Sequence, residues 1–165
     1  MATAAANPAT PPPVARVGLN AGARVFLDTN ILVYASDPSS PFHADAVAAT
    51  TWLVQNGIDS WISRQILREY IASMTRPKPA GPAVPLANVI TNTRRLEHAL
   101  AIVEDGPAVT AELLALLTAI PCQGKQVHDA NIVATMMTHA LSFILTHNTA
   151  DFARFSHHIR IIPLV

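Results

Sequence analysis

An apolar run over residues 24–34 constrains the fold more than any other stretch, because three consecutive polar residues, Asp28, Thr29 and Asn30, interrupt it. The β-branched and aromatic residues before Asp28 predict a buried strand, and the apolar residues after Asn30 predict a helix. A carboxylate therefore ends a strand, where ligands gather in open α/β sheets. The alternative is that one of the three residues only caps the following helix, since all three types are good N-caps.

Composition places the chain among globular proteins and leaves its charge uninformative. The 165 residues fit one domain, and the 50% that are apolar suffice for a core. Because no apolar segment could span a membrane and no secretory signal pattern is present, we expect a soluble, cytoplasmic protein. The single cysteine, Cys122, excludes an intramolecular disulfide. Eleven basic and eleven acidic residues cancel, which neither predicts nor forbids nucleic-acid binding.

The order of predicted elements indicates an α/β domain. Residues 1–23 are rich in Ala and Pro, and we expect a disordered tail there, outside the fold. From residue 24 on, strands and helices alternate, which favours a parallel sheet. Strands are predicted over 25–27, 58–62, 141–146 and 159–162, and helices after Asn30 and over 42–55, 64–75, 86–103, 108–120 and 127–140. We therefore predict a three-layer α/β/α domain over residues 24–165 with a small, mostly parallel central sheet.

Four of the eleven acids lie in apolar surroundings where surface carboxylates are unexpected: Asp28, Glu69, Asp129 and Asp151. Glu69 is on the flank of a helix, and Asp151 follows a strand end by a few residues. On a helical wheel, Asp129 points toward the apolar stripe of its helix, so it needs a capping, hydrogen-bonding or cationic partner. The alternatives are that Asp129 satisfies free N–H groups of its own first turn and that Asp151 is an ordinary loop residue.

Together the four acids predict a divalent cation site. Gathered carboxylates raise one another's pKa, and hard cations such as Mg²⁺ relieve the repulsion. The chemistry that fits is phosphodiester hydrolysis. The seven histidines have no recognised zinc-ligand spacing. Candidate phosphate contacts, or alternatively plain solvated surface, are Arg64, Arg68, Arg76, Lys78, Arg94 and Arg95.

Four passages, in this order, resemble a PIN-domain ribonuclease, and specifically a VapC-type toxin of bacterial toxin–antitoxin pairs. They are FLDTNILVY over residues 26–34, REY over 68–70, VHDANIVA over 127–134 and ILTHNTADF over 144–152. The resemblance spans residues 24–165. It implies a PIN-like fold, cleavage of RNA, a cognate antitoxin protein and a homodimer.

The same resemblance implies that Asp28, Glu69, Asp129 and Asp151 are the catalytic residues and the ligands of Mg²⁺ or Mn²⁺. It also implies that Thr29, Asn30, Thr146 and Asn148 support them. Many relatives carry an acid at the position of Asn148, so the division of roles between Asn148 and Asp151 stays open. Two other functions are considered. Haloacid-dehalogenase-like phosphohydrolases also place an aspartate after a strand, but they carry a second one where this chain has Asn30, and a non-catalytic RNA- or protein-binding module would need no metal.

Overall fold

The computed structural model describes residues 11–77 and 84–165. In chain order the elements are η1 (Pro13–Arg16), β1 (Arg24–Leu27), α1 (Thr29–Ser36), α2 (His43–Gln55), β2 (Asp59–Ser63), α3 (Arg64–Met74), α4 (Leu86–Ala99), β3 (Ala101–Val103), α5 (Pro107–Ala119), α6 (Gln126–Thr138), β4 (Phe143–Thr146), α7 (Thr149–Phe152), η2 (Ala153–Phe155) and β5 (Arg160–Pro163). Strands and helices alternate, as the sequence predicts.

The five strands form one parallel sheet in the order β3-β2-β1-β4-β5. In the register of the sheet, Phe26 lies opposite Trp61 of β2 on one side and Ile144 of β4 on the other. Because β1 is central and covered on both faces, Phe26 and its neighbours are all buried, which explains their continuous apolar run. The edge position of β5 explains how it tolerates Pro163, whose nitrogen cannot donate a hydrogen bond.

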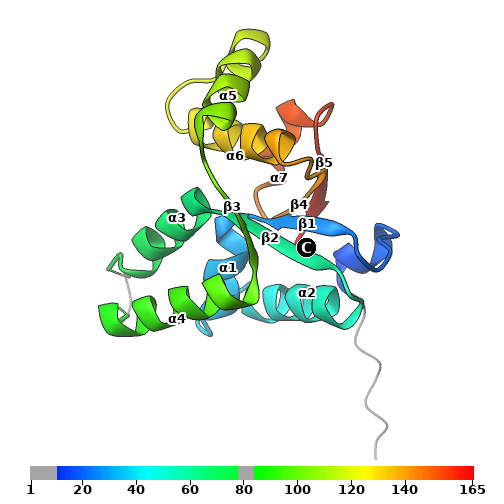
Figure 1. Cartoon of the computed structure of the whole chain (residues 1–165). Coiled ribbons are helices and arrows are strands. Elements are labelled where there is room, and N and C mark those ends of the chain that lie inside the picture. Colours follow the sequence, from blue (N-terminus) through cyan, green and yellow to red (C-terminus); the bar gives the residue numbers. More distant parts are fainter. Residues whose placement is uncertain (1–10, 78–83) are drawn as a thin grey trace, which may run out of the picture.

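Helices cover both faces of the sheet, which confirms the three-layer prediction. In Figure 1, α1, α2 and α4 lie below the sheet, whereas α6 and α7 lie above it. Helix α5 packs along α6 and extends away from the sheet. None of the helices in the described ranges combines the length and the apolar character that crossing a bilayer needs.

Two hydrogen bonds position α3, one at its start and one that joins it to α1. Ser63 ends β2 and caps α3, with its hydroxyl accepting from the Ile66 N–H at 3.4 Å. The fully buried Tyr70 of α3 donates its hydroxyl to Ser36 of α1 at 3.0 Å. This contact holds α3 against α1, so that side chains at the carboxyl edge of the sheet face each other across the two helices.

The predicted helix over residues 86–103 is too long. Helix α4 ends at Ala99, and residues 101–103 form β3, the edge strand beside β2. The apolar run Ala101-Ile-Val103 suits a helix or a short strand equally well by pattern alone. Pairing of Ile102 with Ile62 selects the strand, because the β2 edge offers hydrogen-bonding partners that only an extended segment can use.

The expected tail over residues 1–23 is corrected for its second half. Residues 13–16 form η1, which packs against α2 and β5, and Val14 is fully buried in the core. A single branched side chain in a stretch rich in Ala and Pro carries no periodicity, so the sequence pattern could not reveal it. Residues 1–10 of the expected tail, and residues 78–83 between α3 and α4, lie outside the described residues.

Candidate active site

A groove of about 720 Å³ opens at the carboxyl edge of the sheet. Seven of the eight predicted site residues line it: Asp28, Thr29, Asn30, Glu69, Asp129, Asn148 and Asp151. The eighth, Thr146, is fully buried behind the groove and contacts Asp28. Parallel strands end at the same edge of a sheet, so residues that follow β1 and β4 converge although more than a hundred positions separate them in the sequence.

Asp28 is the most buried of the four acids, with 7% of its surface exposed. It is the N-cap of α1: Oδ1 accepts from the Thr29 N–H at 2.6 Å, while Oδ2 accepts from Asn30 Nδ2 at 2.6 Å. Capping therefore coexists with a position in the groove. The net pKa of Asp28 is raised to about 6. Burial is the main cause, the hydrogen bonds to the carboxylate lower the pKa, and the charge of Glu69 raises it.

The hydroxyl of Thr146 connects three parts of the site. It donates to Asp28 Oδ2 at 2.6 Å and accepts from Asn30 Nδ2 at 3.1 Å and from the Asn148 N–H at 3.0 Å. Asn30 Oδ1 accepts from the N–H of His147 at 3.1 Å. The first turn of α1 and the end of β4 are thus joined through polar contacts that leave the Asp28 carboxylate little freedom to rotate.

Glu69 extends from α3 toward the same groove and is half-buried. Thr29 Oγ1 donates to its Oε2 at 2.7 Å, and Gln65 Nε2 donates to its Oε1 at 2.7 Å. Gln65, absent from the predicted site, also donates to the carbonyl of His128 at 3.1 Å and is itself only 6% exposed. The available signal was a polar amide four residues before Glu69, beside the apolar stripe of its helix.

Asp129 lies in the first turn of α6 and is half-buried. Its carboxylate accepts no hydrogen bond from any residue that the structure describes, so the capping alternative finds no support. Burial is the main cause that raises its pKa to about 6, and the charges of Asp151, Asp28 and Glu69 contribute to the same rise. Asp151, on α7, and Asn148 are both exposed where they line the groove.

The donor set of the groove fits a hard divalent cation. Carboxylate oxygens are the ligands that Mg²⁺ and Mn²⁺ prefer, and burial together with the repulsion among these carboxylates raises the pKa of Asp28 and of Asp129. Over residues 11–77 and 84–165, however, no three His, Cys, Asp or Glu side chains lie close enough together to form a ready-made metal cluster. Like charges separate when no cation neutralises them, so the side chains would have to approach one another around an ion.

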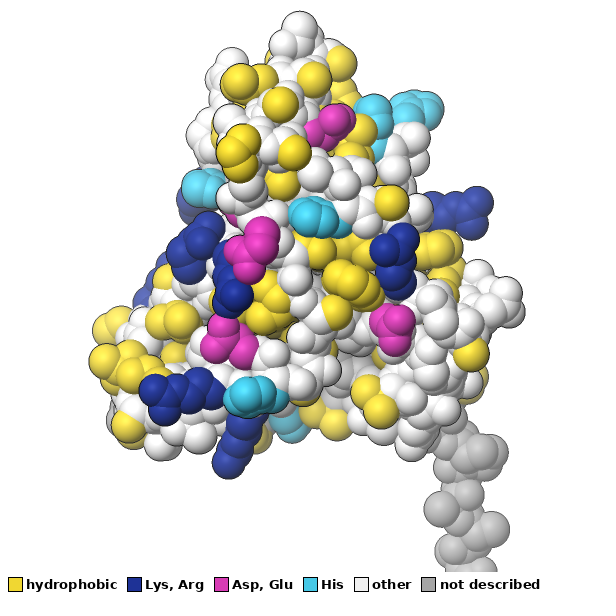
Figure 2. Space-filling model, viewed as in Figure 1, with side chains coloured by type: hydrophobic (Ala, Val, Ile, Leu, Met, Phe, Trp, Pro, Cys, Tyr) yellow, Lys and Arg dark blue, Asp and Glu magenta, His cyan; other side chains and the backbone are white. Residues whose placement is uncertain are grey.

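Two cationic side chains, Arg76 and Lys125, line the same groove as the acids. Of the other predicted phosphate contacts, Arg64 is held by Glu97 at 2.7 Å and Glu104 at 3.1 Å. Lys78 lies outside the described residues. Figure 2 shows acidic and basic side chains next to one another on the visible face, so the charges are not separated into one acidic and one basic surface.

The chain matches a known protein family in sequence and several solved structures in fold. The family model described as PIN domain matches residues 25–157. No curated protein matches the chain. Among solved structures, the chain is similar to VapBC2 from Rickettsia felis, described as bound to a DNA fragment from its promoter, with 18% identity and a TM-score of 0.63. That match covers 84% of this chain and 96% of the other.

Two further solved structures resemble the chain over nearly their whole length. A toxin–antitoxin complex from Klebsiella pneumoniae is 20% identical with a TM-score of 0.60, and the match covers 86% of this chain and 98% of that one. The toxin VapC20 from Mycobacterium tuberculosis, described as cleaving the sarcin–ricin loop, is 15% identical with a TM-score of 0.61, and the match covers 84% and 99%. At these identities the likeness establishes a common fold.

Proposed function

This chain belongs to the PIN domain family, and on that premise we propose that it is a metal-dependent endoribonuclease, the toxin of a toxin–antitoxin pair. Its proposed catalytic residues and metal ligands are Asp28, Glu69, Asp129 and Asp151, with Mg²⁺ or Mn²⁺ as the ion. RNA is the proposed substrate and the cytoplasm the proposed location. The observation that carries the proposal is the convergence of these four acids on one groove at the carboxyl edge of a parallel sheet.

The residues of the groove have separate tasks in this proposal. Asp28 is oriented by three side-chain and backbone donors, and Glu69 is oriented by two. Asp129 and Asp151 complete the oxygen ligand set from the other side of the groove. When bound, the ion supplies neutralisation of the carboxylates and polarisation of the phosphodiester. Fixed ligands matter because an ion held in one place needs no rearrangement of its surroundings during hydrolysis.

The groove also contains groups that suit an RNA backbone. Arg76 and Lys125 line it together with the acids, so a phosphate that approaches the acids meets cations as well. The net charge of zero makes such local cations more important, because the protein as a whole does not attract RNA. We therefore propose that Arg76 and Lys125 contact phosphates on either side of the scissile bond.

The toxin assignment rests on the fold and on the descriptions of similar structures. Two of them are described as a toxin–antitoxin complex and as a toxin that cleaves the sarcin–ricin loop. By analogy we propose that an antitoxin protein binds this chain and covers the acidic groove. A gene for a small DNA-binding protein next to the gene for this chain would support the assignment.

We further propose that the chain forms a homodimer. Leu114 on α5 is 61% exposed, and apolar side chains crowd the α5 end of the face in Figure 2. Helix α5 lies away from the sheet, so the rest of the fold cannot cover these side chains. Light scattering should give twice the mass of one chain, and Leu114→Glu should reduce it to one. A monomeric parent protein would contradict this part of the proposal.

RNA cleavage tests the nuclease proposal against the two other functions. The purified chain should cleave RNA with Mg²⁺ or Mn²⁺ and lose activity in EDTA, whereas Asp59→Asn, an exposed acid outside the groove, should leave the rate unchanged. Asp28→Asn and Asp129→Asn should each lower the rate by roughly a hundredfold or more. Unchanged cleavage in both variants would refute the site. Phosphomonoester hydrolysis without RNA cleavage would favour a phosphohydrolase, and RNA binding without cleavage a non-catalytic module.

A further inference from the structure

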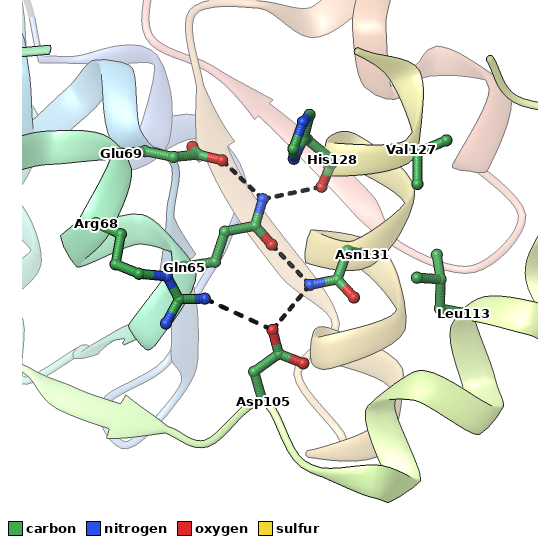
Figure 3. A pocket seen from close by; sticks show the side chains of 8 residues that line it. All are labelled: Gln65, Arg68, Glu69, Asp105, Leu113, Val127, His128 and Asn131. Carbon is green, nitrogen blue, oxygen red and sulfur yellow. Dashed lines mark hydrogen bonds and ion pairs between the residues drawn. The ribbon is translucent and has the colours of Figure 1, made fainter. Parts of the chain in front are cut away.

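A second cavity, of about 350 Å³, lies beside the groove between α3, the β3–α5 loop and α6. Figure 3 shows the side chains that line it. Glu69 and His128 line both the cavity and the groove, so the two spaces adjoin along these residues. Among the polar residues that line the cavity and not the groove, Gln65 orients Glu69, whereas Arg68, Asp105 and Asn131 have no task in the proposed chemistry. The cavity is within the size range of small-molecule sites in proteins.

The floor of the cavity is a rigid network of amides. Gln65 Nε2 donates to Glu69 and to the His128 carbonyl, and Gln65 Oε1 accepts from Asn131 Nδ2 at 2.7 Å. The second hydrogen of Asn131 Nδ2 goes to Asp105 Oδ2 at 3.2 Å. Both donors of Asn131 are therefore used, which fixes its Oδ1 as an acceptor. Within the described residues, nothing donates to Asn131 Oδ1 or to Asp105 Oδ1.

The open edge of the cavity presents acceptors beside one cationic donor group. Arg68 Nη2 lies 3.8 Å from Asp105 Oδ2, too far for a strong hydrogen bond, and the Arg68 side chain is 66% exposed. The Asp105 side chain is 25% exposed. The carboxylate and the guanidinium therefore lie side by side, and one edge of a ligand can contact both with little loss of existing contacts. Its edge must carry neighbouring N–H donors for Asp105 and an acceptor for Arg68.

We propose that this cavity binds a guanine base of the RNA substrate, an inference that rests on the nuclease function proposed above. The Watson–Crick edge of guanine carries an amino group, a ring N–H and a carbonyl in a row. The two N–H groups match the Asp105 carboxylate, and the carbonyl matches Arg68. Asn131 Oδ1 offers a further acceptor to the amino group. Leu113 and Val127 are the apolar residues of the lining and lie on the side away from Arg68.

The other bases match this arrangement less well. Adenine has one amino group and no ring N–H on that edge, so one carboxylate oxygen would remain unused. Uracil has one ring N–H between two carbonyls, and one carbonyl would face the carboxylate. Cytosine has one donor and two acceptors, whereas the cavity offers more acceptors than donors. A buried acceptor left without a donor costs binding energy, so the mismatch discriminates against these bases.

Binding of short RNAs in EDTA tests this inference without cleavage. Fluorescence anisotropy would compare labelled oligouridines that carry one guanine, one hypoxanthine or one adenine in the middle. Hypoxanthine lacks only the amino group of guanine. The parent chain should bind the guanine RNA roughly tenfold more tightly than either of the others. Asp105→Asn should abolish this preference, because the asparagine NH₂ faces the N–H groups of the base, and Arg68→Gln should reduce it.

Matched controls exist on the same elements. Glu104→Gln changes the neighbouring acid, whose side chain is 69% exposed and pairs with Arg64 outside the cavity, and Arg64→Gln changes that partner. Both should keep the preference for guanine, and thermal melting should show that all four variants fold. Equal binding of the three RNAs to the parent chain, absence of binding, or an unchanged preference in Asp105→Asn would overturn the inference.

Cleavage assays separate this inference from the nuclease proposal. Cleavage of a random RNA pool by the parent chain without enrichment of guanine near the cut would overturn the guanine site and leave the nuclease intact. Guanine preference in binding without any cleavage would leave the site and overturn the nuclease. If Asp105→Asn and Arg68→Gln weaken binding of a protein partner and not the preference for guanine, the cavity is a protein site and the inference fails.

Discussion

The hydroxyl of Thr146 donates a 2.6 Å hydrogen bond to Oδ2 of Asp28 and so joins the ends of two neighbouring strands, β4 and β1. The hydroxyl oxygen of Thr146 in turn accepts from Asn30 Nδ2 and from the Asn148 N–H. Its hydrogen-bonding capacity is thereby filled, and it is completely buried. Thr146 does not line the groove, so a substitution at this position should affect the site through its contact with the Asp28 carboxylate.

Thr146→Val should impair the site while keeping the shape of the side chain. It removes the donor to Asp28 and leaves the Asn148 N–H and one of the two Nδ2 hydrogens of Asn30 without an acceptor. We expect Mn²⁺ affinity and RNA cleavage to fall by roughly tenfold or more, and stability to fall by about 2 kcal/mol. Thr146→Ser, which retains the hydroxyl, should restore most of both. Equal defects in the two variants would show that the methyl group, and not the hydroxyl, matters.

Asp129→Asn should stabilise the metal-free chain at neutral pH. The folded pKa of Asp129 is about 6, above its ordinary value of 3.8, so the folded state binds the proton more tightly than the unfolded state. Stability contributed by this group is therefore lost as pH rises from about 4 to about 6. The uncharged variant avoids the loss, and because Asp129 is half-exposed the gain is discounted to about 1 kcal/mol.

Urea unfolding in EDTA at several pH values would measure this effect. The difference between Asp129→Asn and the parent should vanish below about pH 4, where the parent carboxyl is protonated, and should reach its full size above about pH 6. Asp59→Asn serves as the control, because Asp59 is an exposed acid at the start of β2, at the edge of the sheet opposite the groove. A gain that is constant across the whole pH range would contradict the electrostatic explanation.

Gln65→Leu should lower activity through Glu69 without removing any acid. Gln65 donates to Glu69 Oε1 at 2.7 Å and bridges α3 to the His128 carbonyl on α6. Without it Glu69 keeps only the Thr29 contact, and we expect roughly tenfold weaker Mn²⁺ binding. Isothermal titration calorimetry would measure the affinity. Gln55→Leu, at the exposed end of α2, should bind Mn²⁺ as the parent does.

Val14→Ala should destabilise the fold although it lies in a stretch that reads as a tail. Val14 is fully buried in the core, so the loss of two methyl groups should cost roughly 2 kcal/mol of unfolding free energy. Val17→Ala, at a position that is 37% exposed, should cost much less. Chemical denaturation of both variants would decide, and equal stabilities would mean that η1 does not contribute to the domain.

Sequence reasoning predicts the positions of the acids better than the contacts that hold them. Asp28 and Asp129 are conspicuous because each interrupts an apolar pattern, and that pattern follows from burial. Gln65 and Asn131 were missed because their role depends on α3 and α6 lying side by side, which periodicity cannot reveal. The cap of α1 illustrates the same limit: any of three residues could have served, and the structure selects Asp28.

For the fold as well, the sequence predicts the elements that have their own pattern and not those that depend on packing. Strands β1, β2, β4 and β5 were predicted because each has its own run of β-branched or aromatic residues between turn signals. Strand β3 was absorbed into a helix because its three residues acquire strand character only from pairing with β2. Val14 was assigned to a tail because one buried side chain makes no pattern.

Titration of the chain with Mn²⁺ by isothermal calorimetry tests the central claim most directly, namely that the acidic groove is a divalent cation site. The parent chain and Asp59→Asn should take up Mn²⁺ stoichiometrically and release it to EDTA. Asp28→Asn should show no such uptake, and because asparagine is also a good N-cap at the start of α1, the variant should still fold. Uptake by Asp28→Asn that equals uptake by the parent, or no uptake by the parent, would contradict the claim.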